Sequence, residues 1–299
     1  MKLSGLWNSL REEKPLQLVG TINAYTALLA QEAGFRAIYL SGAGVANASY
    51  GIPDLGLTTL DHVLDDASRI MDACDLPLLV DVDTGFGGLR QTKEVVSRLS
   101  KMGAAGIHIE DQVDLKRCGH RPHKVLVPIR KMQDRIKTAL EAKQHASFVI
   151  MARTDALSVE GFDRTLERIH HYVDVGAEMI FFEGATSLQQ YRDVTASINV
   201  PVLANMTEFG KTPLFTKTQL DNHGIQLILY PLSAFRTMSD AALKTYQTIR
   251  KKGTQRSLLT KMQTRKTLYR VLQYDQYEKM QDRYHAKGKK TWLKSKKQV

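Results

Sequence analysis

The sequence predicts a (β/α)8 barrel, and three observations support that prediction. Eight short apolar segments occur along the 299 residues, and each is followed by a segment with helical periodicity. The apolar segments are continuous rather than alternating, which is typical of parallel strands that are buried on both faces. Their number matches the strands of one closed barrel. A doubly wound open sheet is the alternative, but no G-x-G-x-x-G turn follows the first strand.

The strands are indicated by short runs of β-branched and large apolar residues between turn-forming residues. One example is the run Phe148-Val-Ile-Met-Ala, which ends at Arg153. In chain order, strands are expected at 16–20, 37–40, 78–82, 106–110, 147–153, 178–182, 201–204 and 226–229.

The helices are expected between these strands, with local signals at several ends. Gly34 suits the left-handed residue that follows a helix, and Thr58 or Thr59 can cap the next one. A turn of small residues, 41–44, and a loop rich in glycine and proline, 51–56, separate these two helices. Helices are expected at 3–11, 24–33, 59–74, 91–102, 128–144, 161–175, 188–197 and 214–222, with long helices from 234 to about 285.

Composition favours a single globular domain, because an apolar fraction of 43% is ample for a large core. We expect the barrel domain, with additional C-terminal helices, to cover 1–285 and a basic tail to cover 286–299. No apolar run approaches the roughly 20 residues that span a bilayer. The first 15 residues lack the apolar stretch of a signal peptide, and two cysteines suit a reducing compartment. A cytoplasmic protein without a membrane partner is expected.

The net charge of +11 is unevenly distributed. Residues 244–299 contain 17 lysines and arginines against 3 acidic residues, whereas residues 1–243 contain 25 against 28. A basic C-terminus can bind nucleic acid by releasing counterions, so a non-catalytic nucleic-acid-binding protein is an alternative of a different class. Such segments more often serve solubility or packing, and we do not expect nucleic acid as a partner.

In a barrel of this type, functional groups lie at the C-terminal ends of the strands. Those ends carry an unusual number of polar side chains, and the acidic ones cluster after the third to sixth strands. They are Asn23, Tyr25, Tyr39, Asp81, Asp83, Glu110, Asp111, Arg153, Asp155, Glu183, Asn205, Thr207 and Tyr230.

Asp81-Val82-Asp83 is the candidate metal site, because two carboxylates at one strand end can converge on a cation. Hard oxygen ligands favour Mg2+, with Mn2+ as a possibility. Glu110 and Asp111 could contribute through water. The alternative role of the pair is to cap the following helix, which suits one aspartate better than two.

The loop 116–122, Lys-Arg-Cys-Gly-His-Arg-Pro, is the candidate catalytic loop. Positive charge beside Cys118 favours the thiolate and so lowers the pKa of the thiol. The alternative is a solvated basic loop with an incidental cysteine. The other cysteine, Cys74, is expected in the core. Structural roles are expected for five histidines, His62, His108, His170, His171 and His223.

Arginines supply the candidates for carboxylate recognition, because the guanidinium group binds carboxylates through two parallel hydrogen bonds. Arg153, Arg236 and Arg265 are the three candidates. Arg153 stands out because it ends an otherwise apolar strand. A surface ion pair is the alternative role for each.

Several stretches between Val19 and Tyr269 resemble the 2-methylisocitrate lyase family, within the isocitrate lyase and phosphoenolpyruvate mutase superfamily. They include LPLLVDVDTGFG, GIHIEDQV, KRCGHRPHK, FVIMARTDAL and NMTEFGKTPLF. The resemblance implies a barrel with one helix swapped between subunits, in a homotetramer built as a dimer of dimers. It also implies a Mg-dependent lyase of the methylcitrate cycle for propionate catabolism, which cleaves (2S,3R)-2-methylisocitrate, a tricarboxylate, into pyruvate and succinate.

The nearest alternative is isocitrate lyase or another superfamily lyase that acts on a related 2-hydroxy acid. The Arg121-Pro122 pair after Cys-Gly-His favours the methylated substrate. Relative to the family pattern, Ala43 replaces a glycine and Met206 replaces an isoleucine. No departure removes a charged catalytic residue.

The same resemblance assigns roles to individual positions. Asp81 and Asp83 correspond to the metal ligands, and Cys118 to the catalytic thiol that acts as general acid. To these we add Tyr39 as the candidate general base, with Glu110, Lys116 and His120 as further candidate catalytic residues. The substrate-binding positions are Ser41, Gly42, Ala43, Cys118, Gly119, Arg153, Glu183, Asn205, Met206, Thr207, Arg236 and Arg265.

Overall fold

The structure is a computed structural model that describes residues 5–114, 116–117, 119 and 121–286. It contains two compact units, 1–239 and 240–299. The single domain expected over 1–285 and the separate tail stay predictions. Among the described residues, no helix is both long enough and apolar enough to cross a membrane.

The first unit is a closed barrel of eight parallel strands, in the order β1 to β8, so the predicted fold class is confirmed. The barrel closes where β1 pairs with β8, with Leu18 opposite Leu229. An open doubly wound sheet is therefore excluded. The strands are β1 (Leu16–Gly20), β2 (Ala37–Leu40), β3 (Leu78–Asp81), β4 (Gly106–Glu110), β5 (Val149–Thr154), β6 (Met179–Phe182), β7 (Val202–Asn205) and β8 (Leu227–Tyr230).

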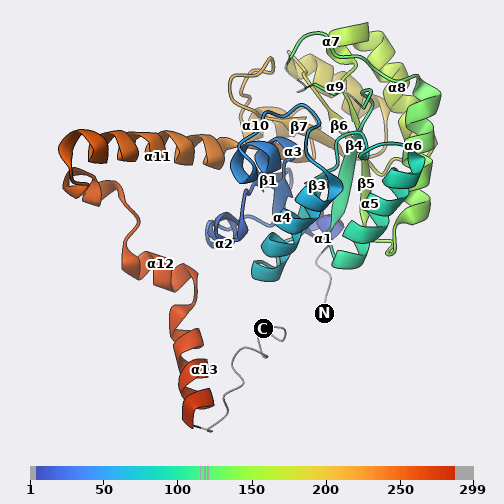
Figure 1. Ribbon diagram of the computed structural model, residues 1–299. Coiled ribbons are helices and arrows are strands. Elements are labelled where there is room, and N and C mark those ends of the chain that lie inside the picture. The colour runs from blue at the N-terminus through green and yellow to red at the C-terminus, as the bar shows by residue number, and fades with distance from the viewer. Residues whose placement is uncertain (1–4, 115, 118, 120, 287–299) are drawn as a thin grey trace. The chain divides into compact units, whose positions relative to one another are not determined.

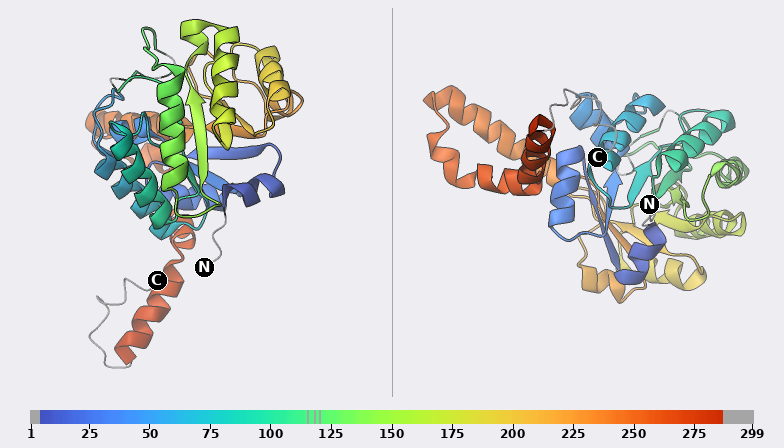
Figure 2. Two further views of the ribbon diagram at one scale, coloured as in Figure 1. Left: turned by 90° about the vertical axis from the view of Figure 1, so that its right-hand side faces the viewer. Right: turned by 90° about the horizontal axis from the view of Figure 1, so that it is seen from below.

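Helices surround the strands, as Figures 1 and 2 show. A short π-helix, Val45–Ser49, and α7 (Leu157–Glu160) occur where loops were expected. The helix expected over 214–222 is shorter, because Thr216 caps it through the backbone N–H of Gln219. The other helices of this unit are α1 (Leu6–Glu12), α2 (Ala24–Glu32), α3 (Gly42–Gly44), α4 (Leu60–Ala73), α5 (Leu89–Met102), α6 (Ile129–Ala142), α8 (Phe162–Asp174), α9 (Leu188–Ser197) and α10 (Lys217–Asp221), with α11 (Ser233–Lys252) continuing into the second unit.

The apolar core has two parts, because successive side chains of a strand point to opposite faces. One part lies between the strands and the helices and includes Ile107 and Ile109 of β4. The other fills the inside of the barrel with residues such as Leu16 and Met151. Leu6 of α1 packs into this second part at the N-terminal end of the strands.

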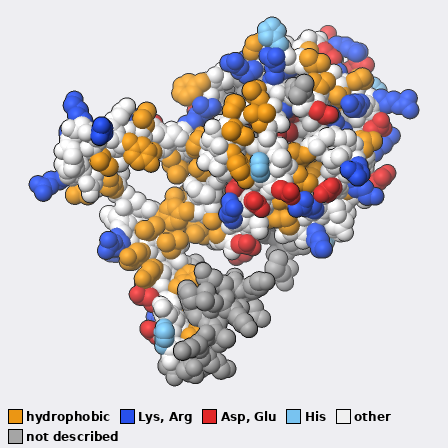
Figure 3. Space-filling view, viewed as in Figure 1, with side chains coloured by type: hydrophobic (Ala, Val, Ile, Leu, Met, Phe, Trp, Pro, Cys, Tyr) orange, Lys and Arg blue, Asp and Glu red, His pale blue; other side chains and the backbone are white. Residues whose placement is uncertain are grey.

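The second unit contains the rest of α11, a 3-10 helix (Arg256–Lys261), α12 (Arg265–Val271) and α13 (Tyr274–Ala286). The long helices expected here are interrupted near Gly253 and Gln273, which both have positive φ angles. Many large apolar side chains of this unit are exposed, and Figure 3 shows them in orange. They include Leu243, Tyr246, Ile249, Leu259, Tyr274 and Tyr277.

Candidate active site

The alternation of side chains along the strands brings the predicted residues together at one end of the barrel. On β4, Ile107 and Ile109 pack toward the helices, whereas His108 lies inside the barrel, stacked on Tyr39 and tilted against Phe181. The same alternation along β3, β5 and β7 directs Asp81, Arg153 and Asn205 inward. They meet at a cavity of about 380 Å³, which is also lined by Tyr39, Ser41, Ala43, Asp54, Lys116, Gly119, Arg121, Glu183, Thr207 and Arg236.

The Asp81 and Asp83 carboxylates lie close together, and backbone groups hold that of Asp81. Asp81 Oδ2 accepts a hydrogen bond from the Gly42 N–H at 3.0 Å, and Oδ1 accepts one from the Asp83 N–H at 3.0 Å. A Cβ atom at Gly42 would lie 3.1 Å from Asp83 Oδ1 and 3.2 Å from Asp81 Oδ2. Both carboxylates therefore reach one point, and a glycine at position 42 keeps it open.

This arrangement fits a hard divalent cation. Among the described residues, no group of three or more histidine, cysteine or acidic side chains is placed to hold a metal. A pair of carboxylates suits Mg2+, a cation that commonly keeps several water ligands.

Lys116 balances the charge of this acidic cluster. Its Nζ lies 2.7 Å from Asp83 Oδ1 and also forms an ion pair with Asp54. Burial would lower the pKa of Lys116, but Asp83, Asp54 and Glu110 raise it well above its ordinary value. Burial and the neighbouring Asp81 charge raise the pKa of Asp83 to about 6, against the opposing pull of Lys116. Burial acts in the same direction on Asp81, but His108, Lys116 and Arg153 bring its pKa below the ordinary value.

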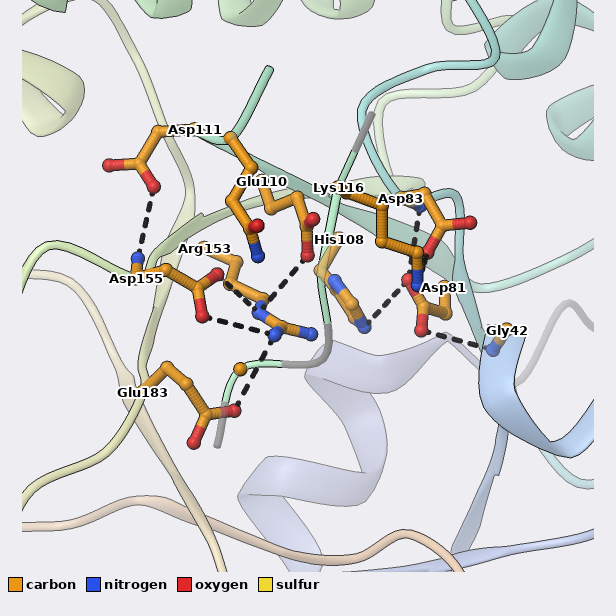
Figure 4. A network of polar contacts seen from close by, with 12 residues as sticks. Gly42, Asp81, Asp83, His108, Glu110, Asp111, Lys116, Arg153, Asp155 and Glu183 are labelled. Carbon is orange, nitrogen blue, oxygen red and sulfur yellow. Dashed lines mark hydrogen bonds and ion pairs between the residues drawn. The ribbon is translucent and has the colours of Figure 1, made fainter. Parts of the chain in front are cut away.

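Arg153 lies at the centre of a second cluster, with three carboxylates around its guanidinium (Figure 4). Its Nε is 3.0 Å from Asp155 Oδ2 and 3.4 Å from Glu110 Oε2, and Nη2 is 3.7 Å from Glu183 Oε2. The guanidinium also lies 5.1 Å from the centre of the Phe181 ring. Burial would lower the pKa of Arg153, but the three carboxylates raise it, so this cation stays charged. Burial raises the pKa of Glu110 well above its usual range.

Tyr39 and His108 form a buried pair beneath the Asp81 carboxylate. The Tyr39 hydroxyl is 2.8 Å from His108 Nε2 and 3.3 Å from Asp81 Oδ2. Burial and the Asp81 charge raise the pKa of Tyr39 well above its ordinary value, and burial lowers the pKa of His108 to about 4. A protonated phenol donates rather than accepts a proton, so the role of Tyr39 as general base stays a prediction that its environment opposes.

Some sequence-predicted residues lie elsewhere. Met206 does not line the cavity, because its side chain points outward into the core between strands and helices. Arg265 begins α12 in the second unit. Cys118 and His120 lie outside the described residues, so their roles stay predictions. Asp111 turns away from the cavity, and its carboxylate accepts hydrogen bonds from Thr154 and Tyr172.

Arg236 does line the cavity, at its exposed rim. Its Nε is 3.6 Å from Glu208 Oε2, and its guanidinium lies 5.7 Å from the centre of the Phe209 ring. Its side chain is 43% exposed, so an incoming carboxylate could reach it.

Sequence reasoning missed three residues of this site. Asp54 lies in the loop expected at 51–56, where no pattern separates it from other loop residues. Lys124 looks like one more cation of the basic loop, yet its ammonium is buried against Asp155. His108 was assigned a structural role but contacts both Tyr39 and Asp81. Its place on an apolar strand, two residues before Glu110, was the available signal.

Comparisons with known proteins show the family to which this chain is related. Residues 7–250 match the family model described as phosphoenolpyruvate phosphomutase. The chain is 54% identical over 281 residues to 2-methylisocitrate lyase of Escherichia coli strain K12, with 94% of this chain and 95% of that protein covered. A crystal structure of 2,3-dimethylmalate lyase superposes with a TM-score of 0.85 at 32% identity, with 92% of each chain covered. A phosphonopyruvate hydrolase complex with oxalate and Mg2+ shares the fold, with a TM-score of 0.83 at 24% identity over 95% of this chain and 99% of that one.

Proposed function

We propose that this chain, which belongs to the phosphoenolpyruvate phosphomutase family, is a carbon–carbon lyase that cleaves (2S,3R)-2-methylisocitrate to pyruvate and succinate. The observation that carries the proposal is a cavity lined by Asp81, one of two adjacent carboxylates suited to a divalent metal, and by the buried Arg153. Relatives named 2-methylisocitrate lyase match 94% of the length of this chain. This activity places the enzyme in the methylcitrate cycle of propionate catabolism.

The charges of the cavity suit a tricarboxylate substrate. Arg153 and Lys116 are fixed cations within the cavity, and Arg236 lies at its rim. Guanidinium groups bind carboxylates with defined geometry, so the arginines would orient the substrate as well as attract it. Short neutral groups at Ser41, Asn205 and Thr207 add hydrogen-bonding partners.

Asp81 and Asp83 would hold the metal, which we propose to be Mg2+. When bound, the metal would polarise the substrate hydroxyl and its adjacent carboxylate. Gly42 contributes by leaving room between the two carboxylates, and its N–H keeps Asp81 oriented.

The reaction requires loss of the tertiary hydroxyl proton to a base. The bond between the hydroxyl-bearing carbon and the carbon that becomes part of succinate then breaks. Its electron pair remains on the succinate carbon. Arg153 would stabilise the negative charge that develops on the adjacent carboxylate. Cys118 would donate its thiol proton to the carbanion and so complete succinate, while the hydroxyl carbon becomes the carbonyl of pyruvate.

We include a homotetramer, as a dimer of dimers with an exchanged helix, in the proposal. The exposed apolar side chains of the second unit support it, because contiguous exposed apolar surface marks protein interfaces. A cytoplasmic location is part of the same proposal and is supported by the free thiol of Cys74.

The test is product formation by the purified protein with Mg2+. It should release pyruvate from 2-methylisocitrate faster than glyoxylate from isocitrate, with both products identified by chromatography. No pyruvate, or a clear preference for isocitrate, would reject the assignment. The same protein, run on a sizing column with light-scattering detection, tests the tetramer.

A further inference from the structure

Lys124 holds the backbone of the candidate catalytic loop, 116–122, against the barrel. Its Nζ donates hydrogen bonds to the Gly119 carbonyl oxygen at 2.5 Å and to Asp155 Oδ1 at 3.0 Å. The Lys124 and Asp155 side chains are 2% and 0% exposed. A buried ammonium needs such partners to offset its loss of hydration, so this position is energetically well defined.

Asp155 links this lysine to the substrate arginine. Its Oδ2 accepts a hydrogen bond from Arg153 Nε at 3.0 Å, and its Oδ1 accepts one from Arg153 Nη2 at 3.3 Å in addition to that from Lys124. The Asp155 N–H donates to Asp111 Oδ1 at 3.0 Å. The Asp155 carboxylate therefore fixes the Lys124 ammonium and the Arg153 guanidinium relative to each other.

Gly119 shows how closely the loop approaches this cluster. A Cβ atom at Gly119 would lie 2.7 Å from Arg153 Nη2, 2.9 Å from Asp155 Oδ1 and 2.9 Å from Glu183 Cγ. Only a glycine lets the backbone come this near.

We propose that Lys124 is a positioning residue of the lyase reaction, which holds Gly119 at a fixed place beside Arg153 through Asp155. It acts through Gly119 and Asp155 and does not line the cavity itself. The inference rests on the lyase function proposed above. Because misplacing a catalytic group by about 1 Å can cost roughly 100-fold in rate, loss of this contact should reduce turnover far more than substrate binding.

The experiment compares Lys124→Met with Lys143→Met, a matched control far from the site. Lys143 also forms an ion pair, with Glu178 at 2.6 Å, and donates to the Phe148 carbonyl oxygen at 3.1 Å. For Lys124→Met we expect kcat to fall about 100-fold while KM changes less than about threefold. Lys143→Met should retain the wild-type kcat.

Limited trypsin digestion gives a readout that does not depend on activity. Trypsin cleaves after Arg117, and fragments from this bond are identified by mass spectrometry. Release of the loop in Lys124→Met should accelerate this cleavage about tenfold, with no change in Lys143→Met. If the wild type has no lyase activity but the cleavage result holds, the proposed function fails while the structural role of Lys124 stands.

A second variant guards against a folding defect. Lys124→Gln keeps a donor for one of the two acceptors, so its kcat and cleavage rate should lie between those of the wild type and Lys124→Met. Wild-type kcat and cleavage in both Lys124 variants would overturn the proposal. So would a loss of kcat that follows the loss of thermal stability equally in the Lys124 and Lys143 variants.

Discussion

The two ends of the barrel are built from the same eight strands but differ completely in chemistry. At the N-terminal end, inward side chains such as Leu16 and Ala37 form an apolar core with Leu6 of α1. At the C-terminal end, the inward positions of neighbouring strands are Asp81, Glu110 and Arg153, which are buried as well. Burial is therefore not what distinguishes the two ends.

The difference lies in how each end offsets the loss of water. Apolar side chains gain free energy when they leave water, whereas charged groups lose it unless they are paired. The charged end meets this need with interlocking ion pairs, in which Lys116 pairs with Asp54 and Asp83. The apolar end can then serve stability and the charged end chemistry. Substitutions at one end should therefore change one property and leave the other unchanged.

The largest effect is expected at the charged end. Cys118→Ser should reduce kcat about 1,000-fold, because a hydroxyl is a much weaker proton donor than a thiol. Its melting temperature should equal that of the wild type. Steady-state kinetics and thermal unfolding together check this, and near-normal turnover would remove the thiol from the chemistry.

The reverse result is expected at the apolar end. Leu16 is fully buried, so Leu16→Ala should lower the free energy of unfolding by about 2–5 kcal/mol through lost burial and a residual cavity. Its kcat, measured well below the melting temperature, should match the wild type. Urea unfolding gives the stability change, and a large loss of kcat in fully folded protein would contradict the separation.

His108 lies where the two ends meet and should make stability depend on pH. Its pKa is about 4 when folded and about 6.5 when unfolded, so between these values only the unfolded chain binds the proton. The contribution of His108 to native stability should fall as pH falls below 6.5, by about 2 kcal/mol at pH 5. Urea unfolding in EDTA should show a weaker decrease between pH 7 and pH 5 for His108→Gln. Identical pH profiles for both proteins would refute this.

The smallest effect concerns the metal. Asp83→Asn keeps the shape of the side chain but removes one of the two carboxylates, so Mn2+ affinity should fall about 10- to 100-fold. Electron paramagnetic resonance of free Mn2+ measures the affinity without reference to activity. Asp111→Asn, whose carboxylate points away from the cavity, is the matched control and should bind Mn2+ like the wild type.

Much of this site could be predicted from the sequence. Side chains alternate in direction along a strand, so a residue's place at a strand end indicates whether it faces the inside of the barrel. Asp81 and Arg153 were found in this way. Met206 shows the limit, since it directly follows the inward-pointing Asn205 and is therefore turned outward. Lys124 and Asp54 could not be found, because loop residues follow no period. Their partners, Asp155 and Lys116, lie 31 and 62 residues away in sequence.

The pairing of β1 with β8 has a consequence for synthesis of the protein. Leu16 pairs with Leu227, so the first strand cannot complete its hydrogen bonds until more than two hundred further residues have left the ribosome. During that time β1 presents a bare edge that could pair with another nascent chain. The step that closes the barrel is thus also the step that protects the unfinished chain from aggregation.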